Sequence, residues 1–197
     1  MSFPSQPDLI RGLARLSLTG ERKTLSIDGF HRAGVLVPLI VSDAGGDLLF
    51  TRRTDHVETH KGQISFPGGM TDKSDNDIVH TSLREANEEL GIAGELIDVR
   101  GILDDLAVPS GFIITPVVGT LRALPVLVPN PREVAEAFTV PLGFFCDPLN
   151  GRSELREFQG GKREVWFYQH GEHNIWGATA MIVRSLMLQM GLAGTAL

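Results

Sequence analysis

The clearest periodic pattern of apolar residues lies near the middle of the chain. Val79, Leu83, Ala86 and Leu90 recur at intervals of four, three and four residues, the spacing of one face of an α-helix. Gly91 follows directly, and a glycine after the last apolar position commonly ends a helix. The pattern therefore predicts an amphipathic helix that packs one side on a core.

Shorter apolar runs elsewhere predict β-strands. Residues 34–41 and 48–53 are joined by a segment that contains Gly45 and Gly46, and glycines between two such runs favour a hairpin. Four further runs have strand character, namely residues 96–103, 113–121, 138–140 and 164–168.

Helices are predicted near both ends of the chain. Residues 7–18 place apolar side chains on one side and follow Ser5, a residue type that caps helix starts. Residues 175–190 form a mostly apolar closing helix. Both helices offer apolar faces to the rest of the chain or to a second copy, so a homodimer is compatible with the sequence.

These elements together predict an α+β protein, an α/β/α sandwich in which mixed β-sheets lie between helices. A length of 197 residues is close to that of one domain. We expect residues 31–197 to form that domain and residues 1–30 to form a helical extension that packs on it.

Composition limits the partners and the cellular location that we expect for the protein. The net charge of −6 argues against a broad nucleic-acid surface, because phosphate backbones are bound through clustered Lys and Arg. No apolar run approaches the roughly 18 residues of a membrane span, and the first residues lack the pattern of a signal peptide. Cys146 is the single cysteine, so no intrachain disulfide is expected. A cytoplasmic protein without membrane contact fits this composition.

Three carboxylates gather on one side of the predicted central helix. Glu85, Glu88 and Glu89 occupy positions i, i+3 and i+4, which we expect to form an exposed face away from the apolar stripe. Like charges at this spacing destabilise a helix by roughly 0.2–0.5 kcal/mol per pair, and Arg84 offsets only part of this through its i+4 partner Glu88. A divalent cation would offset the rest. Oxygen ligands alone favour Mg²⁺ or Mn²⁺, while the alternative is an ordinary solvated surface.

A glycine turn precedes this helix and favours the metal interpretation. Phe66 and Pro67 lead into Gly68 and Gly69, whose bare backbone can approach a ligand or lend a carbonyl oxygen to a metal.

This combination resembles the signature of the Nudix hydrolase family. That signature runs glycine, five residues, Glu, seven residues, then Arg-Glu-apolar-any-Glu-Glu-any-Gly-apolar. The first half departs from it, because one extra residue separates Gly69 from Arg84 and Asn76 stands in place of the first Glu. In the family that Glu mostly supports the loop, so we expect Asp75 or Asp77 to take over this role. The second half is complete, with Arg84, Glu85, Ala86, Glu88, Glu89, Gly91 and Ile92 in place.

The longer loop is similar to that of the coenzyme A pyrophosphatases within this family. An upstream motif over residues 49–69 also resembles theirs, with Thr54 standing for Ser and Glu58 for Arg. The Glu58 change reverses a charge that the neighbouring basic residues could compensate. The positions that agree are Leu49, Thr51, Arg53, Gly62, Phe66, Pro67, Gly68 and Gly69. The expected substrate-binding residues are Arg52, Arg53, His60, Lys61, Phe66 and Gly68.

The resemblance implies hydrolysis of a phosphoanhydride in coenzyme A or a derivative, giving phosphopantetheine or its acyl form and adenosine 3′,5′-bisphosphate. Water would attack with the help of Mg²⁺ or Mn²⁺ and without a covalent intermediate. Glu88 and Glu89 are the expected principal metal ligands and Glu85 a further ligand or proton acceptor. Gly69 would offer its carbonyl oxygen, and Arg84 would orient the carboxylates.

Two other functions stay open. The substrate could be another nucleoside diphosphate derivative, such as ADP-ribose, a dinucleoside polyphosphate or a nucleoside triphosphate. The chain could instead be an inactive Nudix module that senses a nucleotide, although the three intact glutamates argue against this.

Five further ionisable residues are weaker candidates for the site. Glu133 is a minority candidate for the catalytic base. His170 and His173 have a spacing that zinc could use, but a turn is the better interpretation. Asp104 and Asp105 could face the cleft, although we favour a role in capping the loop.

Overall fold

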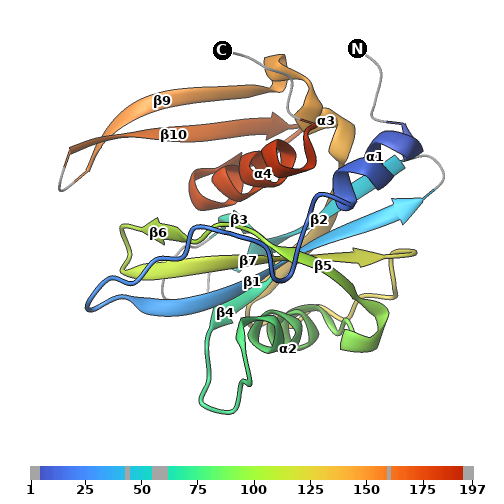
Figure 1. Cartoon of the computed structure of the whole chain (residues 1–197), viewed down its shortest axis with the longest axis horizontal. Coiled ribbons are helices and arrows are strands. Elements are labelled where there is room, and N and C mark those ends of the chain that lie inside the picture. The colour runs from blue at the N-terminus through green and yellow to red at the C-terminus, as the bar shows by residue number, and fades with distance from the viewer. Residues whose placement is uncertain (1–4, 43–44, 55–61, 159–160, 193–197) are drawn as a thin grey trace.

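A mixed β-sheet lies between helices in this protein (Figure 1). The structure is a computed structural model that describes residues 5–42, 45–54, 62–158 and 161–192. Within these residues the main sheet has eight strands. Its central path runs β3 (Ile64–Ser65), β2 (Gly45–Arg53), β1 (His31–Ser42), β7 (Phe112–Leu121) and β5 (Asp98–Ile102). Off this path, β4 (Gly68–Met70) pairs with β1, β6 (Leu106–Val108) with β7, and β8 (Val134–Pro141) with β2.

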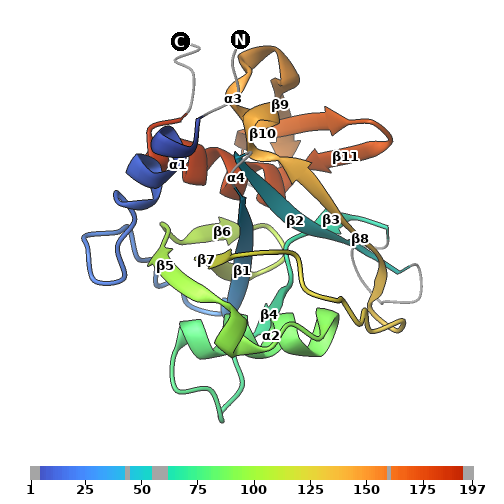
Figure 2. The ribbon, with the colours of Figure 1, turned by 90° about the vertical axis from the view of Figure 1, so that its right-hand side faces the viewer.

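Helices cover both faces of this sheet. In Figures 1 and 2, α2 (Ile78–Leu90) lies on one face, while α4 (Gly177–Met190) and α1 (Gln6–Leu13) lie on the other. This arrangement confirms the predicted α/β/α sandwich.

The parallel pair β1 and β7 forms the centre of the sheet, with a continuous register from His31 opposite Phe112 to Ile40 opposite Leu121. Successive side chains of a strand point to opposite faces, so each of these strands contributes to two cores. Val37, Leu39 and Val118 belong to the core beneath α4. Leu36, Ile40 and Leu121 belong to the core beneath α2. Burial on both faces explains why the two strands are nearly continuous apolar runs.

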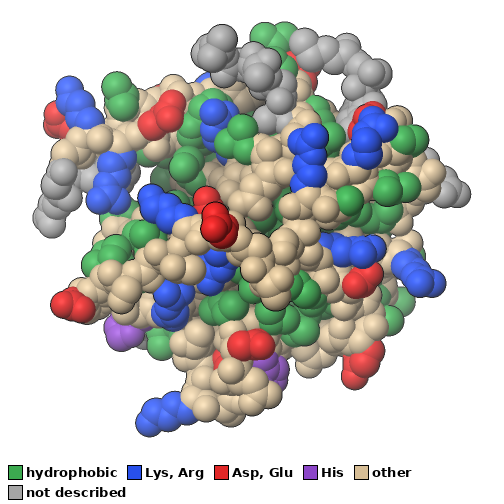
Figure 3. Space-filling view, viewed as in Figure 1, with side chains coloured by type: hydrophobic (Ala, Val, Ile, Leu, Met, Phe, Trp, Pro, Cys, Tyr) green, Lys and Arg blue, Asp and Glu red, His purple; other side chains and the backbone are tan. Residues whose placement is uncertain are grey.

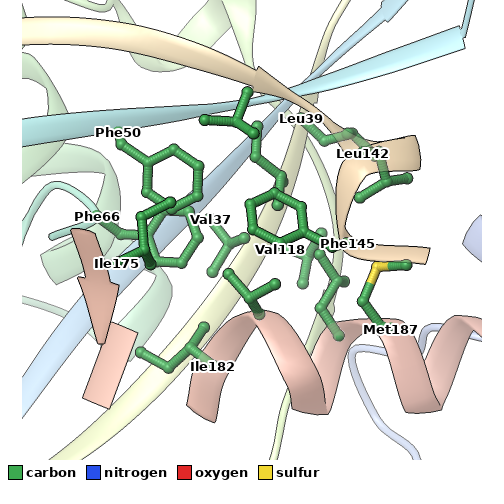
Figure 4. Close-up of a cluster of buried hydrophobic side chains, with 14 of the residues drawn as sticks. Val37, Leu39, Phe50, Phe66, Val118, Leu142, Phe145, Ile175, Ile182 and Met187 are labelled. Carbon is green, nitrogen blue, oxygen red and sulfur yellow. The ribbon is translucent and has the colours of Figure 1, made fainter. Parts of the chain in front are cut away.

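Figure 4 shows the core beneath α4. Phe50 stacks on Phe66 with ring centroids 4.6 Å apart, and Phe145 lies at 6.1 Å from Phe50. Ile182 and Met187 of α4 close the cluster and are almost completely buried. The aromatic rings thus fix the distance between α4 and the sheet.

A smaller sheet follows α3 (Leu142–Cys146) and the short turn Pro148–Asn150. Its strands are β9 (Gly151–Phe158), β10 (Gly161–His170) and β11 (His173–Trp176), with β10 in the middle. The β9–β10 hairpin projects along α4 (Figure 1), and β11 lies beside β3 of the main sheet (Figure 2). The two sheets therefore meet where β2 and β3 end.

The first helix is shorter than predicted. Ser5 caps α1 and shares a capping box with Asp8, as expected, but the helix ends at Leu13 rather than at residue 18. The backbone beyond it joins the edge of the main sheet, where the Ile102 N–H donates to the Ser17 carbonyl at 3.0 Å. This tertiary hydrogen bond overrides the helical pattern of residues 14–18. The division of the chain at residues 30 and 31 stays a prediction.

The predicted start of the last helix is wrong. Ile175 and Trp176 belong to β11, where Ile175 lies opposite Tyr168, and the helix begins only at Gly177. Gly177 has a φ of 63°, a backbone conformation that separates strand from helix. The predicted strand 96–103 also starts later, because residues 94–96 form a 3₁₀ turn.

Several short elements escaped the sequence analysis. β3, β4 and β6 have only two or three residues, too few for a period. β9 alternates charged residues on its exposed face, so it shows no apolar pattern. Across the ranges that the structure describes, no helix combines the length and apolar character needed to cross a membrane.

On the face shown in Figure 3, basic and acidic side chains are intermixed among the residues that the structure describes.

Gly34 sets how closely α2 approaches β1. A β-carbon at this position would lie 2.8 Å from Ser82 Oγ and 3.0 Å from the Ile78 carbonyl oxygen. Helix backbone cannot give way as a flexible side chain could. We predict that Gly34→Ala lowers the free energy of unfolding by about 1–3 kcal/mol, measured by urea denaturation. Gly94→Ala is the matched control, because the nearest atom there is Leu83 Cδ1 at 3.9 Å. Equal stability of the two variants would contradict this role for Gly34.

Candidate active site

Helix α2 carries the three predicted glutamates, and its two ends are fixed by the residues around them. The Asp77 side chain accepts a hydrogen bond from the His80 N–H at 2.8 Å and caps the start. Gly91 ends the helix with a φ of 70°, as predicted.

The expectation that all three glutamates lie on an exposed face is wrong for Glu89. Glu89 is only 3% exposed, and Glu85 is half-buried, while Glu88 is exposed. The helix turns its Thr81 and Ser82 side towards Gly34 of β1, where both residues are completely buried. Because the glycine contact sets this rotation, Glu89 faces the sheet.

The two glycines of β4 make room for the carboxylates. A β-carbon at Gly69 would lie 2.5 Å from Glu85 Oε1, and one at Gly68 would lie 2.6 Å from the Gly34 carbonyl oxygen. The Gly68 N–H donates to Glu89 Oε1 at 3.4 Å. Only bare backbone can therefore lie between β1 and the buried side of α2 at this point.

Arg84 connects the acidic groups around the site. Its Nη1 donates to Glu85 Oε1 at 2.8 Å and to Glu88 Oε2 at 3.0 Å. Its Nε and Nη2 each donate to a different oxygen of Asp75 at 3.0 Å, and Nη2 also donates to the Met70 carbonyl at 3.0 Å. The guanidinium thus fixes two of the glutamates relative to the loop before the helix.

Asp75, and not Asp77, makes the bracing contact in this longer loop. Asp75 also accepts hydrogen bonds from Thr81 Oγ1 at 2.8 Å and from the Asp72 N–H at 2.9 Å. The bonds from Arg84 are the main reason that the pKa of Asp75 lies far below its ordinary value. The same pairing raises the pKa of Arg84, so the ion pair stays charged at any physiological pH.

The buried glutamates have too little positive charge around them. The pKa of Glu89 is raised to about 8, chiefly by burial. The negative charges of Glu85 and Glu133 add to this rise, while the Gly68 N–H and the charge of Arg53 oppose it. Burial also raises the pKa of Glu85, although Arg84 opposes this. Two carboxylates that resist ionisation in adjacent positions suit a bound cation, which would favour their charged forms.

The donor set fits a hard divalent ion, since carboxylate oxygens and backbone lie together without sulfur or imidazole. The cage is not complete, however. Among the residues that the structure describes, no three Asp, Glu, His or Cys side chains converge closely enough to hold a metal, and Arg84 is bonded to both Glu85 and Glu88. Glu85 and Glu89 are the two carboxylates that lie against the glycines of β4.

Glu133 lies close enough to influence both of these carboxylates. The Asn130 N–H donates to the Glu89 carbonyl at 2.8 Å, and Asn130 Nδ2 donates to Glu133 Oε1 at 3.2 Å. The Thr54 N–H holds the Glu133 carbonyl at 2.9 Å. These bonds place the candidate base at the end of α2 beside the site.

Arg52 and Arg53 point to opposite faces of the sheet. The Arg53 side chain points to the same face of the sheet as Leu49, the face that α2 covers. Its positive charge opposes the rise in the pKa of Glu89. Its Nε is buried and has no hydrogen-bond partner in the described part of the chain. The Arg52 side chain points to the same face as Phe50, the face that α4 covers, and its Nε donates to Glu136 Oε2 at 2.9 Å. Of this pair, Arg53 is the one beside the carboxylates.

The other expected substrate contacts differ in placement. Phe66 is 3% exposed and stacks on Phe50, so its ring packs in the core and offers no surface to a substrate. Gly68 lies against Glu89 through its N–H. His60, Lys61 and the divergent Glu58 lie outside the described residues.

A cavity of about 370 Å³ opens on the other side of the β2 end. Glu136 accepts a hydrogen bond from Arg52 and lies 3.2 Å from His173 Nε2. The His173 ring stacks on Phe138, with centroids 3.6 Å apart. The sequence analysis missed this group, because its partners are 37 residues apart and no local motif connects them.

The weaker candidates have structural roles. His170 packs edge-on against Phe144, whereas His173 stacks on Phe138 and lies beside Glu136. In the described part of the chain the two histidines belong to no group of three side chains that could hold zinc. Asp105 is buried and bonds Arg22, Arg32, Thr115 and the Leu25 N–H, while Asp104 accepts from the Lys23 N–H. The favoured loop-capping role of both aspartates is confirmed.

Known proteins are similar to this chain in sequence or in fold. The NUDIX domain model matches residues 30–158. An uncharacterized Nudix hydrolase NudL of Photorhabdus laumondii is 38% identical over 176 residues, covering 89% of this chain and 93% of the relative. The NudL of Pectobacterium atrosepticum is 41% identical over 162 residues, covering 81% and 83%. A MutT/nudix family protein from Enterococcus faecalis shares the fold with a TM-score of 0.53 at 13% identity, covering 83% of this chain and 63% of that one.

The domain match and these two relatives, each aligned over more than four fifths of both chains, show that this chain belongs to the Nudix family.

Proposed function

We propose that this protein hydrolyses a phosphoanhydride bond in coenzyme A or a derivative of it, with the help of Mg²⁺ or Mn²⁺. The products would be phosphopantetheine or its acyl form and adenosine 3′,5′-bisphosphate. One observation carries the proposal: Glu85 and Glu89 lie against the two glycines of β4, and burial raises the pKa of both carboxylates.

The residues divide the work as follows. Glu85, Glu88 and Glu89 would supply carboxylate oxygens to the cation, and Gly69 would add its carbonyl oxygen. Arg84 holds Glu85 and Glu88 in place through the bonds at 2.8 and 3.0 Å. When bound, the cation would polarise the phosphate oxygens and lower the pKa of a water molecule.

Two further groups complete the proposal. Arg53 has a buried Nε without a partner among the described residues, so it can donate to a phosphate oxygen next to Glu89. Glu133, or Glu85, accepts the proton of the attacking water. We place the reaction in the cytoplasm, and a homodimer stays a prediction.

Glu88→Gln tests the role of the glutamates directly. Glu88 is exposed, so we predict that the variant folds like the wild type but loses nearly all turnover, a fall on the order of a hundredfold or more. Steady-state rates with Mg²⁺ and Mn²⁺ would measure this. Glu95→Gln changes another exposed glutamate outside α2 and should keep its rate. Wild-type turnover in Glu88→Gln would refute the assignment.

Glu89→Gln should have opposite effects on catalytic activity and on the free energy of unfolding. The folded pKa of Glu89, about 8, exceeds its ordinary 4.5, so the folded state holds its proton more tightly than the unfolded state does. Stability without metal should therefore fall as pH rises from about 4.5 to 8.

We predict that Glu89→Gln removes much of this fall and raises the free energy of unfolding at pH 8 by roughly 2 kcal/mol, while activity is lost. Urea denaturation in EDTA at pH 5 and pH 8 measures it. A variant that is less stable than the wild type at pH 8 would contradict the charge imbalance.

A panel of substrates separates coenzyme A from the alternatives. We expect faster hydrolysis of coenzyme A or its thioesters than of ADP-ribose, a dinucleoside polyphosphate or a nucleoside triphosphate, with products resolved by chromatography. Preference for one of the other compounds would change the assigned substrate but not the assigned reaction, hydrolysis of a phosphoanhydride bond. Binding measured by calorimetry without any product, in Mg²⁺ and in Mn²⁺, would instead identify a nucleotide-sensing module.

A further inference from the structure

The cavity between the two sheets has a defined place in the fold. Its volume is about 370 Å³, and its walls come from the end of β2, the segment before β4, the middle of β8, and β11 with the turn before it. The lining residues are Arg52, Gly62, Gln63, Ile64, Glu136, Glu172, His173, Asn174 and Trp176.

This cavity adjoins the carboxylate site through the end of β2. Arg52 lines the cavity, while its neighbour Arg53 lies beside Glu89 on the opposite face. The Arg53 N–H donates to the Gln63 carbonyl at 3.0 Å, so the cavity wall and Arg53 are joined by backbone. From Ile64 the chain continues directly to Gly68, which contacts Glu89. The two sites are therefore built on the same end of β2, one on each face of the sheet, and a substrate that occupies both would have to pass this strand end.

His173 lines the cavity with a planar ring whose position is fixed by two contacts. Its ring is stacked on Phe138 at 3.6 Å with an interplanar angle of 7°, and its Nε2 lies 3.2 Å from Glu136 Oε1. Glu136 is in turn bonded to Arg52 at 2.9 Å. A ring fixed in this way loses little freedom when another planar group stacks on it.

The charge of the cavity favours a nucleobase over a phosphate. Its lining carries one arginine against two glutamates, and that arginine is already paired with Glu136. A phosphate would thus meet a net negative wall. Carboxylate and amide groups at Glu172 and Asn174 can instead accept hydrogen bonds from an exocyclic amino group.

We propose that this cavity binds the purine base of the substrate, with the amino-bearing base stacked along His173 and read by Glu172 and Asn174. This deepens the proposed function, on which it rests, by assigning the nucleoside end of the substrate to the junction of the two sheets.

The test compares His173→Ala with His170→Ala. Both histidines flank the same turn and contact a phenylalanine, but only His173 lines the cavity. We expect His173→Ala to raise KM for an adenine-containing substrate about tenfold with kcat within about threefold, as the loss of one base stack implies. His170→Ala should change neither constant. A purely structural role of His173 would lower kcat or stability without this separate rise in KM.

Direct binding keeps the proposal testable without turnover. Calorimetry of the metal-free protein should show that AMP binds more tightly than IMP, which lacks the amino group, and that Glu172→Gln reduces this preference. Photolabelling with 8-azido-AMP, competed by AMP, should modify the tryptic peptide of residues 164–184 in the wild type.

The outcomes separate the two proposals. Unchanged KM in His173→Ala, equal binding of AMP and IMP, or labelling elsewhere would overturn the base site, while Glu88-dependent hydrolysis would still support the proposed function. Absence of hydrolysis with AMP binding and labelling as expected would overturn the proposed function and leave the base site supported.

Discussion

The close contact between α2 and the glycines of β1 and β4 is the constraint on which the site depends. Gly34 admits the Thr81 and Ser82 side of the helix, and Gly69 admits the Glu85 carboxylate, each at distances that a β-carbon would prevent. This contact determines which side of α2 is buried. Glu89 consequently leaves water, and its burial raises its pKa to about 8. The close packing that Gly34, Gly68 and Gly69 allow thus determines an electrostatic property of the site, the raised pKa of Glu89.

The charges around the site are distributed unevenly, and this unevenness has a physical consequence. The Arg84 guanidinium donates hydrogen bonds to Asp75, Glu85, Glu88 and the Met70 carbonyl. Its positive charge therefore offsets the negative charges of the loop and of the exposed side of α2. From the residues that the structure describes, the Glu89 carboxylate receives one long hydrogen bond and the more distant charge of Arg53. The imbalance is therefore concentrated on the buried side. A cation bound there would gain more than one bound at the exposed side, because fewer protein charges compete with it.

Local periodicity was sufficient for much of this fold. It predicted the central helix with its Gly91 stop, the hairpin of β1 and β2, and the strands β5, β7, β8 and β10, since each shows an apolar run of its own. The sandwich of helices around a mixed sheet followed from their order. The NUDIX domain match over residues 30–158 confirms the family that the carboxylate pattern resembled, whereas the roles of the individual glutamates stay a prediction.

What could not be predicted depends on contacts between distant residues. The rotation of α2 that buries Glu89 is set by Gly34, more than fifty positions earlier, and nothing in the helix itself reveals it. The predicted boundary between β11 and α4 was misplaced because the apolar residues Ile175 and Trp176 fit the pattern of either element. Their pairing with β10 places them in the strand. The group of Arg52, Glu136 and His173 likewise requires two sheets to meet.

Two neighbouring residues at the end of β2 serve two different surfaces. Arg52 lies opposite Glu136, whereas Arg53 lies opposite Val134, so the extra residue of this irregularity is Ala135 of β8. Such a bulge bends the strand that carries it and increases the local twist. The two arginines point to different faces because side chains alternate along β2. Arg52 therefore joins Glu136 on the α4 side of the sheet, while Arg53 lies beside Glu89 on the α2 side.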